Sequence, residues 1–188
     1  MTAMDLTSNG LLDVRDWDAL EPIEGKRLEM VDGVVIVSPR PTVPHAVVAA
    51  RLIQLFGARS VLPLPEPEVV IAAHGPSTVR VPDLVLPLEA GPADEARFDA
   101  TEILLAVEIV SPGSRRTDYV AKRYDYEQAG IPFYWIIDPD ERRVRCLELV
   151  DRAYREIDVP EDGDGVTLPR PVPIRFGWDR LLGRGQRS

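Results

Sequence analysis

The chain has 188 residues and a mass of 20.9 kDa, a size that suits a single globular domain over residues 1–188. Hydrophobic residues make up 45% of the chain, so it can bury a sizeable core. No apolar run is long enough to cross a bilayer, and the N-terminus lacks the basic start and apolar centre of a secretory signal. We therefore expect neither a membrane protein nor an exported one.

The net charge of −9 argues against tight non-specific binding to a nucleic-acid duplex, because such binding depends on Lys and Arg neutralising phosphates. Local basic patches and bound cations can still dominate near a site. The single cysteine, Cys146, excludes an internal disulfide and suits the reducing cytoplasm, where we expect the protein. With one cysteine and two histidines, carboxylates are the expected metal ligands, which favours Mg²⁺, Mn²⁺ or Ca²⁺ over zinc.

The first half of the chain alternates helical and β patterns. Residues 11–20 have the spacing of a short helix. Residues 27–39 hold two β runs that meet at Asp32-Gly33, a strong hairpin signal. Residues 45–56 are predicted to form a helix that ends at Gly57, and two β-rich stretches follow at 66–73 and 78–88.

The second half begins with an almost continuously apolar run at 103–110, which is typical of a strand covered on both faces. A helix from about Thr117 to Ala129, a buried strand at 133–138 and an outer hairpin over 142–159 follow. From Glu161 onward we expect only a short WDRLL element. This order predicts an α/β fold, a mixed β-sheet core flanked by helices, with an added hairpin.

Glu108 interrupts the apolar run at 103–110. An ionised carboxylate in such a strand costs on the order of several kcal/mol unless a cation, a metal or a cleft relieves the cost. Glu108 is therefore either a glutamate at a strand end, paired with an arginine or capping the next turn, or a functional carboxylate.

Asp83 follows Pro82 in a second apolar β stretch. On adjacent strands of one sheet, Asp83 and Glu108 could share a divalent cation, which would remove their repulsion and polarise a phosphoryl oxygen. A turn aspartate after a proline is the simpler interpretation of Asp83 alone.

Lys122 lies on the helix that returns from the end of the Glu108 strand. Its long side chain could reach back over both carboxylates, orient a water and stabilise charge on a phosphate. The ordinary alternative is a solvent-exposed lysine in an i, i+4 pair with Asp118.

The order Pro82-Asp83, then Glu108 in VEIVSPGS, then Lys122 in DYVAKRYDYEQAGIPFYWIIDP resembles the Uma-two family of restriction-endonuclease-like proteins, in the PD-(D/E)XK nuclease superfamily. RLEMVDGVVIVSPRPTVPH extends the resemblance to residues 26–140, the expected core of the domain. The EIVSP and AGIPFYWIIDP stretches are its specific part, whereas Pro-Asp alone is not specific.

This resemblance implies a restriction-endonuclease-like fold and a hydrolysis of phosphodiesters, with DNA as substrate, that depends on Mg²⁺ (or Mn²⁺). It implies that Asp83, Glu108 and the backbone carbonyl of Ile109 hold the metal and that Lys122 positions the attacking water. The superfamily keeps its lysine two residues after the glutamate, where this chain has Val110. Lys122 therefore has to supply the ammonium, and without it the site is incomplete.

Two more residues are candidates for the site. Glu29 matches a Glu-x-x-Asp-Gly element of the family and is either a further acidic contact to the metal or an exposed strand residue beside Lys26 and Arg27. His45, in the first turn of the helix at 45–56, either touches a phosphate or a metal-bound water or is a partly buried helix residue.

Arg115 and Arg116 follow the loop at the end of the Glu108 strand and are candidate phosphate contacts, with a solvated approach to the next helix as the alternative. Three functions remain open: a DNA endonuclease, a nuclease-fold protein that binds a partner or a nucleic-acid end without cutting, and a hydrolase of small phosphate esters. The charge of −9 and Val110 motivate the last two. A homodimer through the edge of the outer hairpin is a further prediction.

Overall fold

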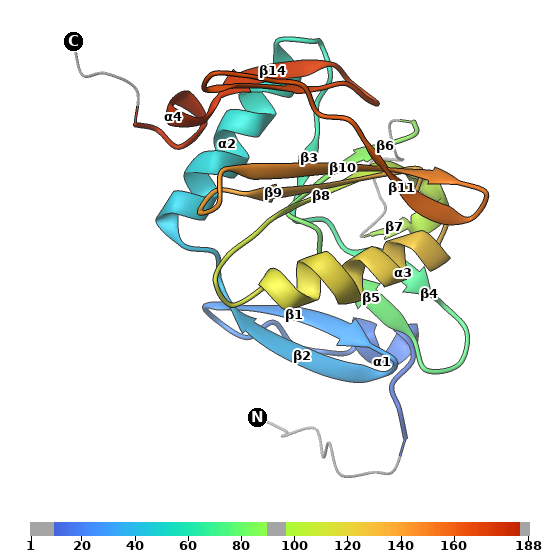
Figure 1. Ribbon diagram of the computed structural model, residues 1–188. Helices are drawn as coiled ribbons and strands as arrows, with labels where there is room; N and C mark the ends of the chain where they lie inside the picture. The colour runs from blue at the N-terminus through green and yellow to red at the C-terminus, as the bar shows by residue number, and fades with distance from the viewer. Residues whose placement is uncertain (1–9, 90–96, 185–188) are drawn as a thin grey trace.

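The computed structural model describes residues 10–89 and 97–184 of the chain. Three β-sheets are stacked with helices between and beside them, and a six-stranded sheet forms the middle layer (Figure 1). No helix in the described ranges is both long and apolar enough to cross a membrane.

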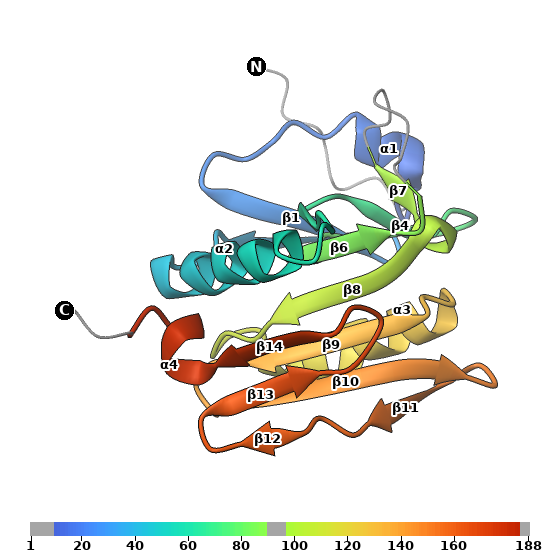
Figure 2. The ribbon, with the colours of Figure 1, turned by 90° about the horizontal axis from the view of Figure 1, so that it is seen from above.

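The middle sheet has the strand order β11-β10-β9-β8-β6-β3 (Figure 2). The apolar run of the sequence forms its centre, where β8 and β9 pair in parallel, and the other neighbours pair antiparallel. The predicted outer hairpin is confirmed as β10 and β11, and β11 is the edge at which the predicted dimer would pair. The strands are β3 (Leu64–Pro65), β6 (Leu84–Pro87), β8 (Ile103–Ile109), β9 (Phe133–Asp138), β10 (Arg143–Val150) and β11 (Ala153–Ile157).

A second sheet of five strands, in the order β2-β1-β5-β4-β7, contains the predicted N-terminal hairpin. Its turn is at Asp32-Gly33, both of which have positive φ. Helix α1 (Val14–Asp18) packs Trp17 against Met30 on one face of this sheet. The strands are β1 (Lys26–Val31), β2 (Val34–Pro39), β4 (Val69–Ala72), β5 (Thr78–Arg80) and β7 (Phe98–Asp99), and the short helix η1 (Ala100–Glu102) follows the last.

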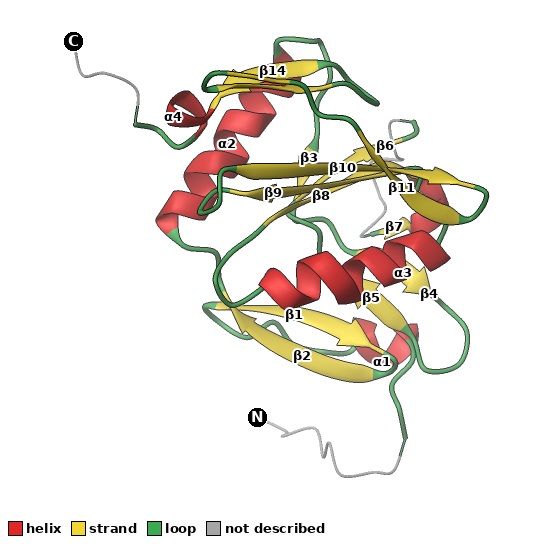
Figure 3. Ribbon diagram, in the orientation of Figure 1, coloured by secondary structure: helices red, strands yellow, loops and turns green. Residues whose placement is uncertain are grey.

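One helix lies between these two sheets (Figure 3). It begins at Arg115, runs through a π-helical stretch, η2 (Thr117–Lys122), and continues as α3 (Arg123–Gln128). It buries Tyr126 against Tyr134 of β9. A π-helical turn changes which side chains face a given direction and is frequent at functional sites. Lys122 is the last residue of this turn.

The other face of the middle sheet is covered by α2 (Val43–Gly57) and by a third sheet that the sequence did not reveal. The sequence predicts only a short WDRLL element from Glu161 onward; this element is present as a helix, but the tail also forms three strands that were not predicted. Its strands are at most four residues long, too short for their alternation of buried and exposed residues to stand out among Pro and Gly. The elements are β12 (Glu161–Asp162), β13 (Gly165–Leu168), β14 (Ile174–Gly177) and α4 (Trp178–Leu181).

The contact between α2 and the middle sheet is predicted to be a main support of the fold. Phe56 is fully buried and stacks on Trp135 with ring centroids 5.6 Å apart. Phe56→Ala should lower the free energy of unfolding by about 3–5 kcal/mol, because it removes buried area and leaves a cavity. Tyr124→Ala, at a side chain that is 63% exposed, is the matched control and should change it by less than about 0.5 kcal/mol. Urea unfolding measures both, and equal effects would contradict the packing.

Candidate active site

Asp83 and Glu108 lie side by side on neighbouring strands of the middle sheet. In the antiparallel pair β6–β8, Leu84 is opposite Val107, so the preceding Asp83 comes level with Glu108. Both carboxylates are almost fully buried, at 3% and 1% exposure. The amide of Ile109 donates a hydrogen bond of 2.7 Å to Asp83 Oδ2, which fixes that carboxylate at the end of β8.

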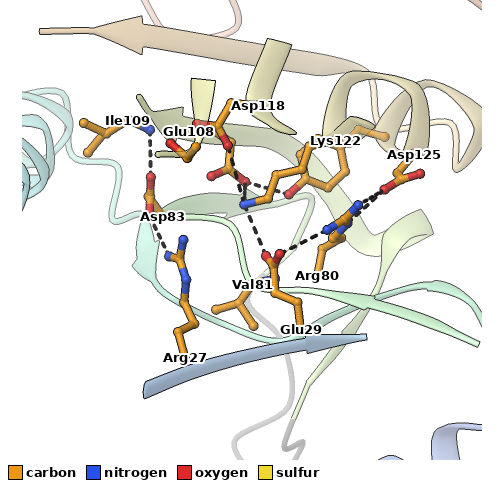
Figure 4. A network of polar contacts seen from close by, with 12 residues as sticks. Arg27, Glu29, Arg80, Val81, Asp83, Glu108, Ile109, Asp118, Lys122 and Asp125 are labelled. Atoms are coloured by element: carbon orange, nitrogen blue, oxygen red, sulfur yellow. Dashed lines mark hydrogen bonds and ion pairs between the residues drawn. The ribbon is translucent and has the colours of Figure 1, made fainter. Parts of the chain in front are cut away.

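Lys122 reaches the same place from the helix between the sheets (Figure 4). Its side chain is 2% exposed, and its Nζ lies 2.9 Å from Glu108 Oε1 and 3.2 Å from Glu29 Oε1. Asp118, one turn earlier, is 3.9 Å away. A solvent-exposed Lys122 is therefore wrong, and so is an exposed Glu29, because both side chains face the buried space between the two sheets.

Asp83 has different partners from Glu108. Arg27 Nη1 on β1 is 2.8 Å from Asp83 Oδ1, and His45 Nε2 on α2 is 3.0 Å from Asp83 Oδ2. Five residues that the sequence analysis named as candidates therefore lie around one point. They are Glu29, His45, Asp83, Glu108 and Lys122.

These residues line a cleft of about 560 Å³ between the two sheets. The loop after β8 forms its rim, where Ser111 N donates a hydrogen bond of 2.9 Å to Ser114 Oγ. The floor carries the buried charges, and the walls come from β1, β2, the start of α2 and the π-helical turn. The cleft is large enough to admit part of a polar substrate, and its charged groups converge on that space.

Four further residues of the network were not predicted from the sequence: Arg27, Arg80, Asp125 and Tyr126. Arg80 bridges Glu29 at 3.0 Å and Asp125 at 2.6 Å, and Tyr126 donates a hydrogen bond of 2.8 Å to Glu108 Oε1. The signals were present: Arg80 is a charge inside an apolar β run, as Glu108 is, and Asp118, Lys122 and Asp125 follow one another at helical spacing.

The charges of this network do not balance. Five carboxylates face three Lys and Arg side chains, so two negative charges are in excess when these eight groups are ionised. Burial raises the pKa of Glu108 to about 8, although Lys122 opposes the rise, and burial raises the pKa of Asp118 to about 6. The groups counted are Glu29, Asp83, Glu108, Asp118 and Asp125 against Arg27, Arg80 and Lys122.

Two other groups stay ionised. Burial works to raise the pKa of Asp83, but the hydrogen bond from His45 and the charges of Lys122 and Arg27 outweigh it and lower the pKa to about 2. Burial alone would lower the pKa of Lys122, but Glu108, Glu29 and Asp118 raise it instead. The cleft therefore holds a charged Asp83 and a charged Lys122 at neutral pH.

The donor chemistry of the cleft fits a hard divalent cation. Carboxylate oxygens are the ligands that Mg²⁺ and Mn²⁺ prefer, and the two negative charges that are in excess when every group is ionised match a +2 ion. Asp118 Oδ2 is buried and accepts no hydrogen bond within the described residues. In those residues no three His, Cys, Asp or Glu side chains are grouped closely enough to hold an ion by themselves. Such an ion would therefore keep waters or substrate oxygens among its ligands, as Mg²⁺ usually does.

Arg115, Arg116 and Val110 lie outside this group. Arg115 pairs with Asp138 at 2.8 Å and with Glu141, and Arg116 is exposed to solvent on the same side. Neither lines the cleft. Val110 is buried in the apolar cluster around Tyr126. Lys122 supplies the ammonium near Glu108 that a lysine at position 110 would otherwise provide.

The fold matches the crystal structure of a putative nuclease belonging to DUF820 from Anabaena variabilis with a TM-score of 0.68 and 18% sequence identity, over 92% of this chain and 98% of the other. No curated protein sequence matches at a significant level.

The chain belongs to the Uma2 family, whose sequence model is described as "putative restriction endonuclease" and matches residues 15–180. The resemblance found in the sequence is therefore confirmed and extends further towards both ends. Fold and family together define a restriction-endonuclease-like nuclease. The roles of the individual site residues stay predictions.

We predict that the metal-free protein loses stability as the pH rises from about 6 to about 8. The folded state keeps a proton on Glu108 up to its pKa of about 8, whereas an unfolded glutamate loses it near the ordinary pKa of 4.5. Raising the pH through this window therefore favours unfolding. Glu108→Gln should remove this part of the slope. Urea unfolding with EDTA at both ends of the window measures it, and an equal slope in the variant would contradict the assignment.

Proposed function

We propose that this chain is a metal-dependent endonuclease that hydrolyses phosphodiester bonds, with DNA as its substrate. The observation that carries the proposal is the position of Lys122 Nζ, 2.9 Å from Glu108 in a cleft that also holds Asp83. A buried ammonium beside two carboxylates of adjacent strands combines a cation site with a group that stabilises developing negative charge. The Uma2 family assignment supports the same reaction.

Asp83, Glu108 and the backbone carbonyl of Ile109 would hold Mg²⁺ or Mn²⁺. When bound, the ion supplies a Lewis acid that polarises the phosphoryl oxygen and lowers the pKa of a bound water. Asp83 is already ionised and is held in place by the Ile109 amide. Tyr126 holds Glu108 from behind through its 2.8 Å hydrogen bond, so the carboxylate needs little reorganisation.

Lys122 would orient the attacking water and stabilise the negative charge that builds on the phosphate. Its ammonium is shared by Glu108, Glu29 and Asp118, so neutralising part of that charge would free N–H groups for the substrate. Glu29 keeps the ammonium on the cleft side, and Arg80 keeps Glu29 in place.

Arg27 and His45 are suited to receive the substrate. Both contact Asp83 in the structure, and both line the cleft. A guanidinium binds phosphate oxygens as readily as carboxylate oxygens, and an imidazole can donate to either. We infer that Arg27 and His45 can exchange their contacts with Asp83 for contacts with the scissile or a neighbouring phosphate.

The strongest competing function is a nuclease-fold protein that binds without cutting. It is favoured by one observation: every carboxylate of the network already has a protein cation within 4 Å. This alternative predicts weak binding of Mn²⁺ and no turnover with any metal. Calorimetric titration with Mn²⁺ beside an activity assay separates the two functions.

Plasmid cleavage tests the proposal directly. Purified protein should nick or cut plasmid DNA with Mg²⁺ or Mn²⁺ and not with EDTA. Asp83→Asn should remove cleavage, because it deletes a metal ligand. Lys122→Met should lower the rate by roughly 10²–10³-fold, because it removes one preorganised group that stabilises charge.

The matched control is Asp158→Asn, which removes one negative charge at an exposed position away from the cleft and should leave the rate unchanged. Cleavage that persists in both Asp83→Asn and Lys122→Met would come from a contaminant and would overturn the proposal. Cleavage of small phosphate esters but not of DNA would assign the reaction to the other substrate class.

A further inference from the structure

A second hollow lies on the far side of the loop that forms the rim of the cleft. Pro112 and Gly113 line both spaces, so the two lie on either side of this loop. The hollow is formed where the helix between the sheets begins and where β10 begins. We call it the arginine groove, and its lining residues are Pro112, Gly113, Arg115, Arg116, Tyr119, Glu141, Arg143 and Arg145.

The arginine groove has a charge opposite to that of the molecule. Four arginines face one carboxylate, Glu141, in its lining, whereas the whole chain carries −9. A positive surface on an acidic protein is a local field that directs an anionic partner to one place.

Two of the four arginines are held by the protein and two are not. Arg115 pairs with Asp138 and Glu141, and Arg145 pairs with Glu156 at 2.8 Å while its guanidinium lies 5.9 Å from the centre of the Tyr119 ring. Arg116 and Arg143 are exposed, and within the residues that the structure describes no carboxylate lies in ion-pair distance of either.

We propose that the arginine groove binds the sugar–phosphate backbone of the nucleic-acid strand that runs through the cleft. Arg116 and Arg143 contact its phosphates, whereas Arg115 and Arg145, which are paired with carboxylates, form the walls of the groove. The inference rests on the proposed function, because the strand is the substrate of the same cleft. It also shows how a chain of charge −9 engages DNA: phosphate contacts are confined to one surface beside the catalytic cleft.

A nucleic-acid strand fits this groove better than an acidic peptide does. Phosphodiesters carry one charge per nucleotide at a regular spacing, and a guanidinium meets two phosphate oxygens at once. The groove and the cleft share the loop at Pro112 and Gly113, so a strand whose phosphate lies near Lys122 can continue over this loop into the groove.

Fluorescence anisotropy of a labelled single-stranded oligonucleotide, with EDTA to prevent cleavage, tests the groove. The double variant Arg116→Ala/Arg143→Ala should bind roughly tenfold more weakly than the unchanged protein or worse, and the slope of log K against log salt should fall by about 1.4, since each lost phosphate contact removes about 0.7. Arg51→Ala/Arg59→Ala removes the same charge at exposed positions outside the groove and should leave affinity and slope close to those of the unchanged protein.

This experiment distinguishes a failure of the proposed arginine groove from a failure of the proposed cleavage reaction. Equal binding by the two double variants, or no binding by the unchanged protein, overturns the groove even if the protein cleaves DNA. A selective loss in Arg116→Ala/Arg143→Ala supports the groove even if no cleavage is found. Polyglutamate that displaces the oligonucleotide at the same concentration of charge would overturn the nucleic-acid assignment in favour of an acidic peptide.

Discussion

The structure depends on one buried ammonium. Lys122 lies between two β-sheets, within 4 Å of Glu29, Glu108 and Asp118, and joins β1, β8 and its own helix at a single point. A buried charge without a partner costs several kcal/mol, on the order of 3–5, so each sheet needs the other to satisfy its charged residue. The floor of the cleft is therefore lined by charged side chains. Carboxylates outnumber cations there, and an excess of negative charge favours the binding of a divalent cation.

The surrounding strands and helices hold Lys122 and its carboxylate partners in place. The parallel strands β8 and β9 are covered on one face by α2 and the third sheet and on the other by the helix that carries Lys122. Arg80 then fixes Glu29 from the lining of the cleft, and Tyr126 fixes Glu108 from the apolar core behind it. The substrate side is built differently, because Arg27 and His45 hold Asp83 through contacts that a phosphate can replace. A floor held by buried ion pairs and walls whose contacts a phosphate can replace suit the proposed binding of a metal and a substrate.

Much of this arrangement could be predicted from the sequence, because its signals are local or lie in one strand. The apolar run around Glu108, the hairpin at Asp32-Gly33 and the helix carrying Lys122 are such signals. The partners of these residues could not be predicted in the same way: Arg80 reaches Glu29 across 51 residues of sequence. The third sheet was missed because its strands are too short to show a period. The π-helical turn at Thr117–Lys122 has no signature in the pattern of residues.

We propose that Asp83 and Glu108 form one metal site beneath Lys122. A crystal structure of the protein soaked with Mn²⁺, with anomalous scattering used to locate the ion, tests this proposal. We expect one ion in contact with carboxylate oxygens of both Asp83 and Glu108, and Arg27 and His45 released from Asp83. An ion bound elsewhere, or Asp83 still paired with Arg27 and His45 with no ion beside Glu108, would contradict it.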